Sequence, residues 1–524
     1  MLRDFGDFQT PPALVSEVLE CLGPVGEKWL RVLEPTCGRG NFVRGLLGSP
    51  APPSEIQAIE LQDVHFEEAR KALERPSAPR VVVTKANVFD LDLRNGVRWK
   101  NTGPLLVIGN PPWVTNAELG TLGSDNLPVK TNLKRLQGLD ALTGSSNFDI
   151  AEYIWLKLIR ELAPERATIA LLCKTAVARN VLRFAFDAAL PITRASIRKF
   201  NAKKWFGASV EACLFRVEVG PGERCYKADV FADLHAREPK TIMGFANGQL
   251  VADVEAHERS AFADGVCPVT WRQGLKHDAA PVMELSYDGS GGLSNKLGEA
   301  VDVESDYVYP LLKGSDLFHR TRPQKYVLVT QKRLGENTNQ LRWTAPQLWD
   351  YLTAHSGTFE RRKSSIYRNK SSFAMFGVGD YSFSLYKVGV SGLHKTPRFR
   401  PIGPVAGRPV MLDDTGYFVA CSSPEQAVLL SGLLNDPACL ELIRSIVFLD
   451  SKRPVTKRLL QRIDLIALLE RTEKYSLLAR AEADLGNLMT TADWQQIVES
   501  ASLVEILFEA MPHGGNDSQM LLDI

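Results

Sequence analysis

The sequence lacks the features that mark several broad classes of protein. It contains no run of eighteen apolar residues, so we expect no membrane-spanning helix. Its first ten residues include acids and no apolar stretch, so we expect no secretory signal there. No GxxxxGK[ST] loop occurs, which disfavours ATP hydrolysis. The eight cysteines show neither CxxC nor metal-type spacing, which predicts reduced thiols in the cytoplasm and no metal site.

A charge excess of either sign is also missing. The 62 basic and 61 acidic residues give a formal net charge of +1, so any polyanionic partner must be held by a local patch. Hydrophobic residues make up 44% of the chain and charged residues 23%, as in ordinary globular proteins. A length of 524 residues allows two or more domains with full cores.

The first part of the chain alternates strand and helix patterns. This alternation is typical of an α/β domain with a mostly parallel sheet. A charged helical stretch covers 65–74, and a second helix with apolar residues at helical spacing covers 148–165. The predicted strands are "RVLEP" (31–35), "EIQAIEL" (55–61), "RVVVTKANVF" (80–89), "PLLVIGN" (104–110), "ATIALLCK" (167–174) and "EACLFRVEV" (211–219).

The pattern changes after about residue 220. Regular alternation stops there, and aromatic, basic and turn-forming residues mix, which indicates a second, mixed α+β domain. We place the domains at 1–230 and 231–510, followed by a flexible tail at 511–524. Within the second domain, the composition of "SYDGSGGLSN" (286–295) predicts a flexible loop.

The stretch "LLVIGNPPWVTN" (105–116) leaves a predicted strand through Asn, two prolines and Trp. Proline has no N–H and a fixed φ, so Pro111 and Pro112 can continue neither a sheet ladder nor a helix. A stiff, open loop must therefore follow the strand. A turn at the edge of the sheet with a packed tryptophan is the plain structural interpretation, but it does not explain Asn110.

A chemical interpretation does explain Asn110. An exocyclic aromatic amine is a poor nucleophile, because its lone pair is delocalised into the ring. Two acceptors on its hydrogens, the Asn110 side-chain oxygen and the Pro111 main-chain oxygen, would free that lone pair. Trp113 offers a face on which a purine can stack. Methyl transfer from a sulfonium then needs positioning more than strong acid–base help.

Three further segments suit a nucleoside ligand at the carboxyl ends of neighbouring strands. In "VLEPTCGRGNF" (32–42), Gly38 and Gly40 let the backbone approach a ligand closely, although a plain glycine turn would look the same. Glu60 ends the next strand, where a carboxylate can take both hydroxyls of a ribose. Either Asn87 or Asp90 can bond the edge of an adenine ring, or serve only as a turn residue.

Taken together, these motifs resemble the S-adenosylmethionine-dependent DNA adenine-N6 methyltransferases, in particular the TaqI-like group. The order of elements is similar over residues 8–219: "FQTPPALVSEVLECL" (8–22), "EPTCGRGNF" (34–42), "IEL" (59–61), "ANVF" (86–89), NPPW (110–113) and "FNAKKWFGASVEACLF" (200–215). The chain departs from that pattern in having Asn87 where Asp is commoner, and Trp113 where Tyr is commoner.

This resemblance implies a Rossmann-like methyltransferase sheet followed by a DNA-recognition domain, with S-adenosylmethionine as cofactor and double-stranded DNA as substrate. It implies that Asn110 and Pro111 activate N6 of a flipped adenine, held between Trp113 and Phe206, with Trp205 as a rival for the second ring. The cofactor residues it implies are Thr10, Glu34, Thr36, Gly38, Gly40, Glu60, Asn87 and Val88, the first five lining the methionine and sulfonium end.

A basic segment in the second domain is the candidate grip on DNA. Residues 361–400 hold nine cations against one acid, Asp380, with aromatic residues interleaved between them. Such a mixture suits phosphate contacts and stacking, although a charged run is often only a solvated face. The predicted DNA contacts are Arg361, Arg362, Lys363, Arg368, Lys370, Lys387, Lys395 and Arg398.

Several alternatives remain open. Cytosine-N4 methylation uses the same amine chemistry, and NPPY-type enzymes also methylate RNA or glutamine side chains. The chain could also be a DNA-binding subunit that keeps a methyltransferase fold, although Asn110 and Glu60 argue against this. Cytosine-C5 methylation is disfavoured because no Pro-Cys pair occurs. We identify no nuclease motif, so a separate restriction endonuclease or a defence-complex subunit is the expected partner.

Overall fold

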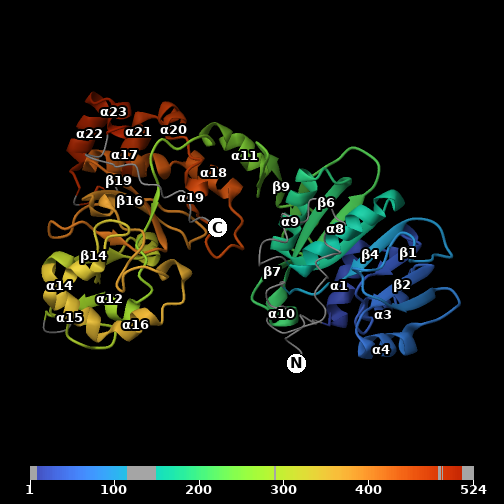
Figure 1. Ribbon diagram of the computed structural model, residues 1–524. Coiled ribbons are helices and arrows are strands. Elements are labelled where there is room, and N and C mark those ends of the chain that lie inside the picture. The colour runs from blue at the N-terminus through green and yellow to red at the C-terminus, as the bar shows by residue number, and fades with distance from the viewer. Residues whose placement is uncertain (1–8, 115–148, 288–290, 482–484, 487, 510–524) are drawn as a thin grey trace. The chain divides into compact units, whose positions relative to one another are not determined.

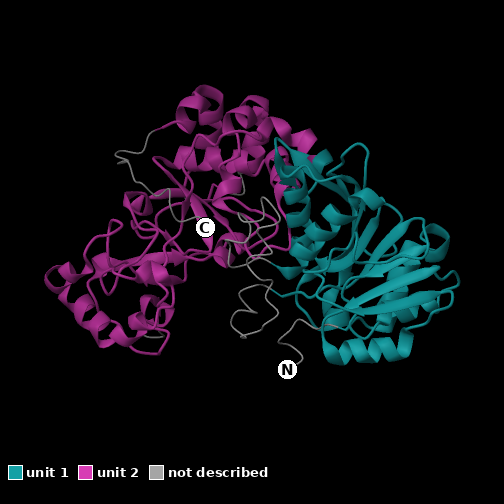
Figure 2. Ribbon diagram, turned by 45° about the vertical axis from the view of Figure 1, so that its right-hand side comes forward, with its two compact units in different colours: residues 1–255 teal, residues 256–524 magenta. Residues whose placement is uncertain are grey.

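The computed structural model describes residues 9–114, 149–287, 291–481, 485–486 and 488–509 (Figure 1). The chain divides into two compact units, Met1–Glu255 and Ala256–Ile524 (Figure 2). Within the described ranges, no helix is both long enough and apolar enough to cross a membrane. The predicted tail at 511–524 lies outside the described residues.

Unit 1 is built on one mixed ten-stranded sheet. Its strands are β1 (Arg31–Glu34), β2 (Glu55–Glu60), β3 (Arg80–Lys85), β4 (Leu105–Gly109), β5 (Thr168–Lys174), β6 (Ile192–Asn201), β7 (Glu211–Val219), β8 (Ala228–Phe231), β9 (Thr241–Ala246) and β10 (Gln249–Val251). Their order is β10-β9-β8-β6-β7-β5-β4-β1-β2-β3. The five neighbouring strands β5, β4, β1, β2 and β3 run parallel to one another, and β7 is antiparallel to both its neighbours, β5 and β6. The predicted α/β fold with a mostly parallel first half is confirmed.

The connectivity of this sheet reverses between β1 and β4, which lie side by side. One branch of the chain runs from β1 to β2 and β3, and the other from β4 to β5. The carboxyl ends of the two branches diverge there, and ligands of open α/β sheets bind in the resulting crevice. The crevice is therefore bordered by the turns after β1, β2, β3 and β4.

Helices pack on this sheet and bring their first turns to the same edge. Val15, Val18 and Phe42 of α1 and α3 belong to one core cluster with the strands, while α8 and α9 pack against each other and contact β5. Asp149 caps α8 by accepting a hydrogen bond from the Ala151 N–H at 3.0 Å. The helices of unit 1 are α1 (Pro12–Leu22), α2 (Val25–Lys28), α3 (Asn41–Leu47), α4 (Asp63–Leu73), α8 (Ile150–Leu162), α9 (Thr175–Asp187) and α10 (Ala202–Phe206), and α11 (Val254–Ser260) leads into unit 2.

The first unit extends further along the chain than residue 230, where we expected the first domain to end. β8 pairs with β6, and β9 and β10 follow it at the edge of the sheet. These three strands complete the sheet of unit 1, so the structural division falls after Glu255.

Unit 2 contains two smaller sheets and a helical layer (Figure 2). One sheet has the order β13-β12-β15-β14-β18 and the other β11-β19-β16-β17; in the described part of unit 2 the strands are β11 (Arg272–Gln273), β12 (Glu284–Tyr287), β13 (Leu293–Asn295), β14 (Val308–Leu312), β15 (Lys325–Leu328), β16 (Tyr386–Ser391), β17 (Arg400–Ile402), β18 (Met411–Leu412) and β19 (Gly416–Cys421). Its helices are α12 (Ala280–Met283), α13 (Gly314–His319), α14 (Leu341–Thr344), α15 (Pro346–Ala354), α16 (Ser356–Glu360), α17 (Pro424–Leu434), α18 (Pro437–Ile446), α19 (Lys457–Leu460), α20 (Leu465–Arg471), α21 (Lys474–Ala481), α22 (Thr491–Ser500) and α23 (Leu503–Leu507).

The prediction of a flexible loop at 286–295 is wrong at both ends of that range, which belong to strands. β12 and β13 pair antiparallel there, with Leu285 opposite Asn295 and Tyr287 opposite Leu293. Leu285 is buried, and its burial in the core sets the register of this hairpin. Gly291 and Gly292, two of the glycines that suggested flexibility, directly precede β13.

Candidate active site

A cavity opens at the carboxyl ends of β1 to β4 in unit 1. Its empty volume is about 1060 Å³, including its open mouth. Each of the four turns contributes to its wall, and Ile150 and Ile154 of α8 close one side. The predicted residues that line it are Thr10, Glu34, Thr36, Gly38, Glu60, Asn87, Val88 and Asn110. One concave site thus joins residues that are up to a hundred positions apart in the sequence.

Glu60 is held in place by three backbone donors. Its Oε2 accepts from the Gly38 N–H at 2.7 Å, and its Oε1 accepts from the N–H groups of Leu61 at 2.9 Å and Gln62 at 2.7 Å. A carboxylate offers about four lone-pair sites, so Oε2 keeps room for one further donor. A sugar hydroxyl in the cavity is a donor of the right kind.

Glu34 and Thr36 provide a second polar group in the wall. In the described part of the chain, Glu34 Oε2 and Thr36 Oγ1 are buried and have no hydrogen-bond partner. Burial raises the pKa of Glu34 well above its usual range, and the charge of Glu60 raises it further. A ligand that brings a positive charge would relieve both effects. The sulfonium and α-ammonium groups of S-adenosylmethionine are such charges, so the donor set fits this cofactor.

The two glycines of the first turn have different roles. Gly38 has φ +52° and lines the cavity, and a Cβ there would come within 2.7 Å of the Gln9 side chain. Gly40 has φ +75° and caps α3, and its hypothetical Cβ would lie 2.2 Å from Leu73 Cδ1 on α4. Gly40 therefore allows two helices to pack closely, and it is not among the residues that line the cavity.

The turn after β3 separates Asn87 from Asp90. Asn87 lines the cavity with Val88, and its Oδ1 accepts a hydrogen bond from the Phe89 N–H at 3.0 Å. Asp90 is exposed and does not line the cavity. Of the two candidates for contact with an adenine ring, the geometry places Asn87 at the site.

The loop after β4 contributes Asn110 and Pro112 to the cavity. Trp113, in contrast, is buried to 6% exposure, and its Nε1 donates to the Leu172 carbonyl oxygen at 3.4 Å. Its ring meets that of Phe206 edge to face, with centroids 5.3 Å apart and planes at 72°. Two rings in this arrangement leave no parallel slot for a third, so holding a base between them requires Phe206 to move.

A buried polar group supports this loop, and the sequence patterns did not reveal it. The Ile150 N–H donates to the Val114 carbonyl oxygen at 3.0 Å, which joins the loop to the start of α8. Asp149 pairs with Lys174 at the end of β5 at 2.8 Å. Glu152 accepts a hydrogen bond from Asn180 at 2.7 Å, and burial raises its pKa to about 7. The chain between 115 and 148 lies outside the described residues.

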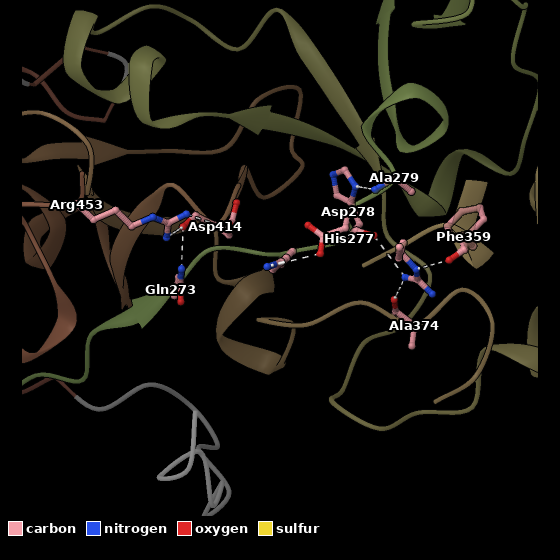
Figure 3. Close-up of polar contacts among 10 residues, drawn as sticks. Gln273, His277, Asp278, Ala279, Phe359, Ala374, Asp414 and Arg453 are labelled. Carbon is pink, nitrogen blue, oxygen red and sulfur yellow. Dashed lines mark hydrogen bonds and ion pairs between the residues drawn. The ribbon is translucent and has the colours of Figure 1, made fainter. Parts of the chain in front are cut away.

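Two of the predicted DNA contacts have structural roles instead. Lys387 is 1% exposed, and its ammonium donates to the Ser384 carbonyl oxygen. Arg362 donates to the carbonyl oxygens of Phe359, Ala374 and Ser372; Figure 3 labels the first two of these acceptors. Both were predicted from charge alone, which does not show where a side chain points. The exposed members of the set are Arg361, Lys363, Arg368, Lys370, Lys395 and Arg398.

Comparison with known proteins gives one close relative and a structural likeness. No family model matches the chain. The sequence is 36% identical to the Type II methyltransferase M.NspV of Nostoc sp. over 468 residues, covering 89% of this chain and 97% of that protein. The structure of the Type IIL restriction-modification enzyme MmeI in complex with DNA is similar at 12% identity and a TM-score of 0.52, over 93% of this chain and 71% of that one.

Proposed function

The chain belongs to the type II methyltransferases of restriction–modification systems, and from this premise we propose that it methylates N6 of an adenine flipped out of duplex DNA. S-adenosylmethionine is the cofactor, and it supplies an electrophilic methyl group when bound. The observation that supports the proposal is the wall shared by Glu34, Glu60 and Asn110. One cavity therefore combines groups suited to a cationic nucleoside with the group that would activate an amine.

Different residues of the cavity bind different parts of the cofactor. Glu60 holds the ribose through the free capacity of Oε2, and Asn87 and Val88 contact the adenine ring of the cofactor. Glu34, Thr10 and Thr36 face its methionine end, where Glu34 neutralises positive charge. Binding these parts separately fixes the direction in which the methyl group points.

Asn110 and Pro111 act on the target base. Their oxygens accept the two hydrogens of the exocyclic amine, which draws the nitrogen out of conjugation and aims its lone pair. Trp113 and Phe206 take the faces of the base once Phe206 has moved out of its contact with the Trp113 ring. Extruding a base costs a few kcal/mol in lost stacking and pairing, and contacts of unit 2 with the flanking duplex would offset that cost. A separate endonuclease would then cut sites that this enzyme leaves unmethylated.

The direct test is transfer of a labelled methyl group from S-adenosylmethionine to mixed-sequence duplex DNA, followed by nucleoside analysis. We expect the label in N6-methyladenine. Label in N4-methylcytosine would keep the mechanism and contradict the choice of base. A protein that binds the cofactor and leaves DNA unlabelled would contradict DNA as the substrate, and RNA and protein would be tested next.

The role of Asn110 is tested by Asn110→Ala under single-turnover conditions. We expect methyl transfer to fall by roughly 10²-fold or more, as when one oriented group is removed from other active sites, with DNA and cofactor binding retained. Asn95→Ala is the matched control, because Asn95 lies exposed in a turn outside the cavity and its side chain donates to Asp92 at 2.8 Å. Full activity of Asn110→Ala would refute the assigned role.

A further inference from the structure

A second large hollow is formed by residues of unit 2 alone. Two segments form its walls, residues 331–339 after β15 and residues 366–376 after α16. Its empty volume is about 1330 Å³, including its open mouth. The floor is apolar, with Ala374, Met375 and Phe376. We call this hollow the unit 2 cleft.

Hydrogen bonds hold the two walls of the unit 2 cleft together. The buried side chain of Gln331 accepts from the Met375 N–H and donates to the Arg333 carbonyl oxygen, both at 2.9 Å. Thr330 donates to the Phe373 carbonyl oxygen at 2.7 Å. Arg362 fastens the same wall from behind through the Ala374 carbonyl oxygen, as Figure 3 shows for the acceptor. These hydrogen bonds tie the two wall segments to each other and to the residues behind them.

Exposed carboxamides stand on both walls. Asn339 lies on the first wall and Asn369 on the second. In the described part of the chain, neither side-chain amide has a hydrogen-bond partner, whereas Asn337 uses its oxygen to accept from the Asn339 N–H at 3.0 Å. A carboxamide presents a donor and an acceptor side by side. The edge of adenine in the major groove presents the complementary pair, the N7 acceptor and the N6 donor.

Exposed cations and one carboxylate lie near these amides: Glu336 also lines the cleft, and its Oε2 accepts hydrogen bonds from the Lys332 N–H at 2.7 Å and the Arg333 N–H at 3.2 Å. Lys370 lines the cleft, and Arg368 and Lys363 lie exposed on the segment that leads to it. On the other wall, Lys332 and Arg333 are exposed, and Arg333 makes one solvent-exposed pair with Asp380 at 3.5 Å. Lysine and arginine supply phosphate contacts that carry no sequence information, whereas amides that bond base edges do carry it. Uncharged amides in the cleft, with exposed lysines and arginines on the adjoining segments, are consistent with these two kinds of contact.

We propose that the unit 2 cleft reads base edges in the major groove of duplex DNA, with Asn339 and Asn369 each recognising an adenine. The Gln331 side chain joins the two segments that carry them, through its hydrogen bonds to Met375 and Arg333. The inference rests on the proposed function for its choice of duplex DNA as ligand. It adds to that function the residues that select the DNA sequence around the methylated adenine.

The test is selection from a randomised duplex DNA pool by binding to the full-length protein, followed by sequencing of the bound fraction. The variants are Asn369→Asp and Asn339→Asp, which keep the size of the side chain and lose its donor. Asn369 has φ +59°, a conformation that Asp also tolerates. Aspartate accepts from N4 of cytosine, so each variant should lose at least roughly tenfold of its adenine preference at one position and gain preference for cytosine there.

Two controls separate base reading from other effects. Asn247→Asp makes the same change at an exposed asparagine with φ +50° in unit 1, and should leave the selected sequence unchanged. Lys363→Ala should weaken binding to all sequences alike and lower the salt dependence by about one phosphate. The proposal is overturned if the Asn variants select the wild-type sequence, or if they weaken all sequences uniformly.

The binding readout also distinguishes this proposal from the proposed function. If the protein transfers no methyl group to DNA but the Asn variants shift the selected sequence, base reading stands and the reaction is wrong. If DNA is methylated and the wild-type protein selects no sequence, the reaction stands and base reading by the unit 2 cleft is wrong.

Discussion

The carboxylate of Glu60 accepts a hydrogen bond of 2.7 Å from the backbone N–H of Gly38. This contact ties the end of β2 to the turn after β1, two of the segments that border the crevice. Gly38 has φ +52° at this point and so allows the turn that aims its N–H at the carboxylate. The cofactor cavity is therefore partly shaped before any ligand arrives.

Replacement of Glu60 should weaken cofactor binding more than it weakens the fold. In Glu60→Gln, an NH₂ group replaces one of the two carboxylate oxygens, so a backbone N–H loses its acceptor. The hydroxyl of the ligand loses a charged partner. Hydrogen bonds to charged groups contribute about 1.5–3 kcal/mol, so we expect affinity for S-adenosylmethionine to fall roughly tenfold to a hundredfold by calorimetry. Glu74→Gln, an exposed position after α4, should bind normally. Unchanged affinity in Glu60→Gln would remove Glu60 from the ribose site.

Phe206 and Trp113 should respond differently to truncation. Trp113 is 6% exposed and belongs to the core, so Trp113→Ala should destabilise unit 1 by about 3–5 kcal/mol. Phe206 is half-buried at the end of α10, so Phe206→Ala should leave thermal unfolding nearly unchanged. If Phe206 stacks on the flipped base, this variant still lowers single-turnover methyl transfer. Normal transfer by a well-folded Phe206→Ala protein would exclude it from the base site.

Replacement of Lys387 tests whether this buried lysine stabilises the fold or binds DNA. Burial lowers the pKa of Lys387 from 10.5 to about 7. Between pH 7 and pH 10.5, this lysine is therefore protonated more in the unfolded state than in the native state. Stability therefore rises with pH across this window, and Lys387→Met should abolish that rise in thermal unfolding. The same variant should bind DNA as tightly as wild type, while Lys363→Ala should bind more weakly. A loss of DNA affinity in Lys387→Met, without a loss of fold, would return Lys387 to the interface.

The strands that position the cofactor cavity could be predicted from the sequence because each is a short apolar run with a clear end. β7 covers 211–219 as predicted, and β4 lies within the predicted 104–110. β6 was missed, since Arg194, Arg198 and Lys199 make its pattern look like a surface segment. It is nevertheless a strand of the sheet, where pairing with β7 and β8 outweighs the intrinsic preferences of its residues.

Residues of the candidate site could be predicted from the sequence only where the residue type and its place after or at the end of a strand favour a single role. Glu60 ends β2 and Asn110 directly follows β4, so their common edge could be inferred from topology alone. The fate of Lys387 and Arg362 could not, because a basic residue looks the same in sequence whether its stem packs inward or outward. Gly40 shows the same limit, since only the structure reveals that Leu73 occupies the space its side chain would need.

Glu152 should make the stability of unit 1 depend on pH near neutrality. Burial raises its pKa from 4.5 to about 7, so the native state holds the proton more tightly than the unfolded state. The stabilisation is complete below pH 4.5 and is lost as the pH rises through 7, by about 3 kcal/mol in all. Glu152→Gln keeps an oxygen for Asn180 and cannot ionise, so it should unfold at a higher temperature than wild type at pH 8 and at nearly the same temperature at pH 4.5. Glu74→Gln, the exposed control, should follow wild type at both pH values. Parallel pH profiles for Glu152→Gln and wild type would mean that the carboxyl group ionises as freely in the fold as outside it.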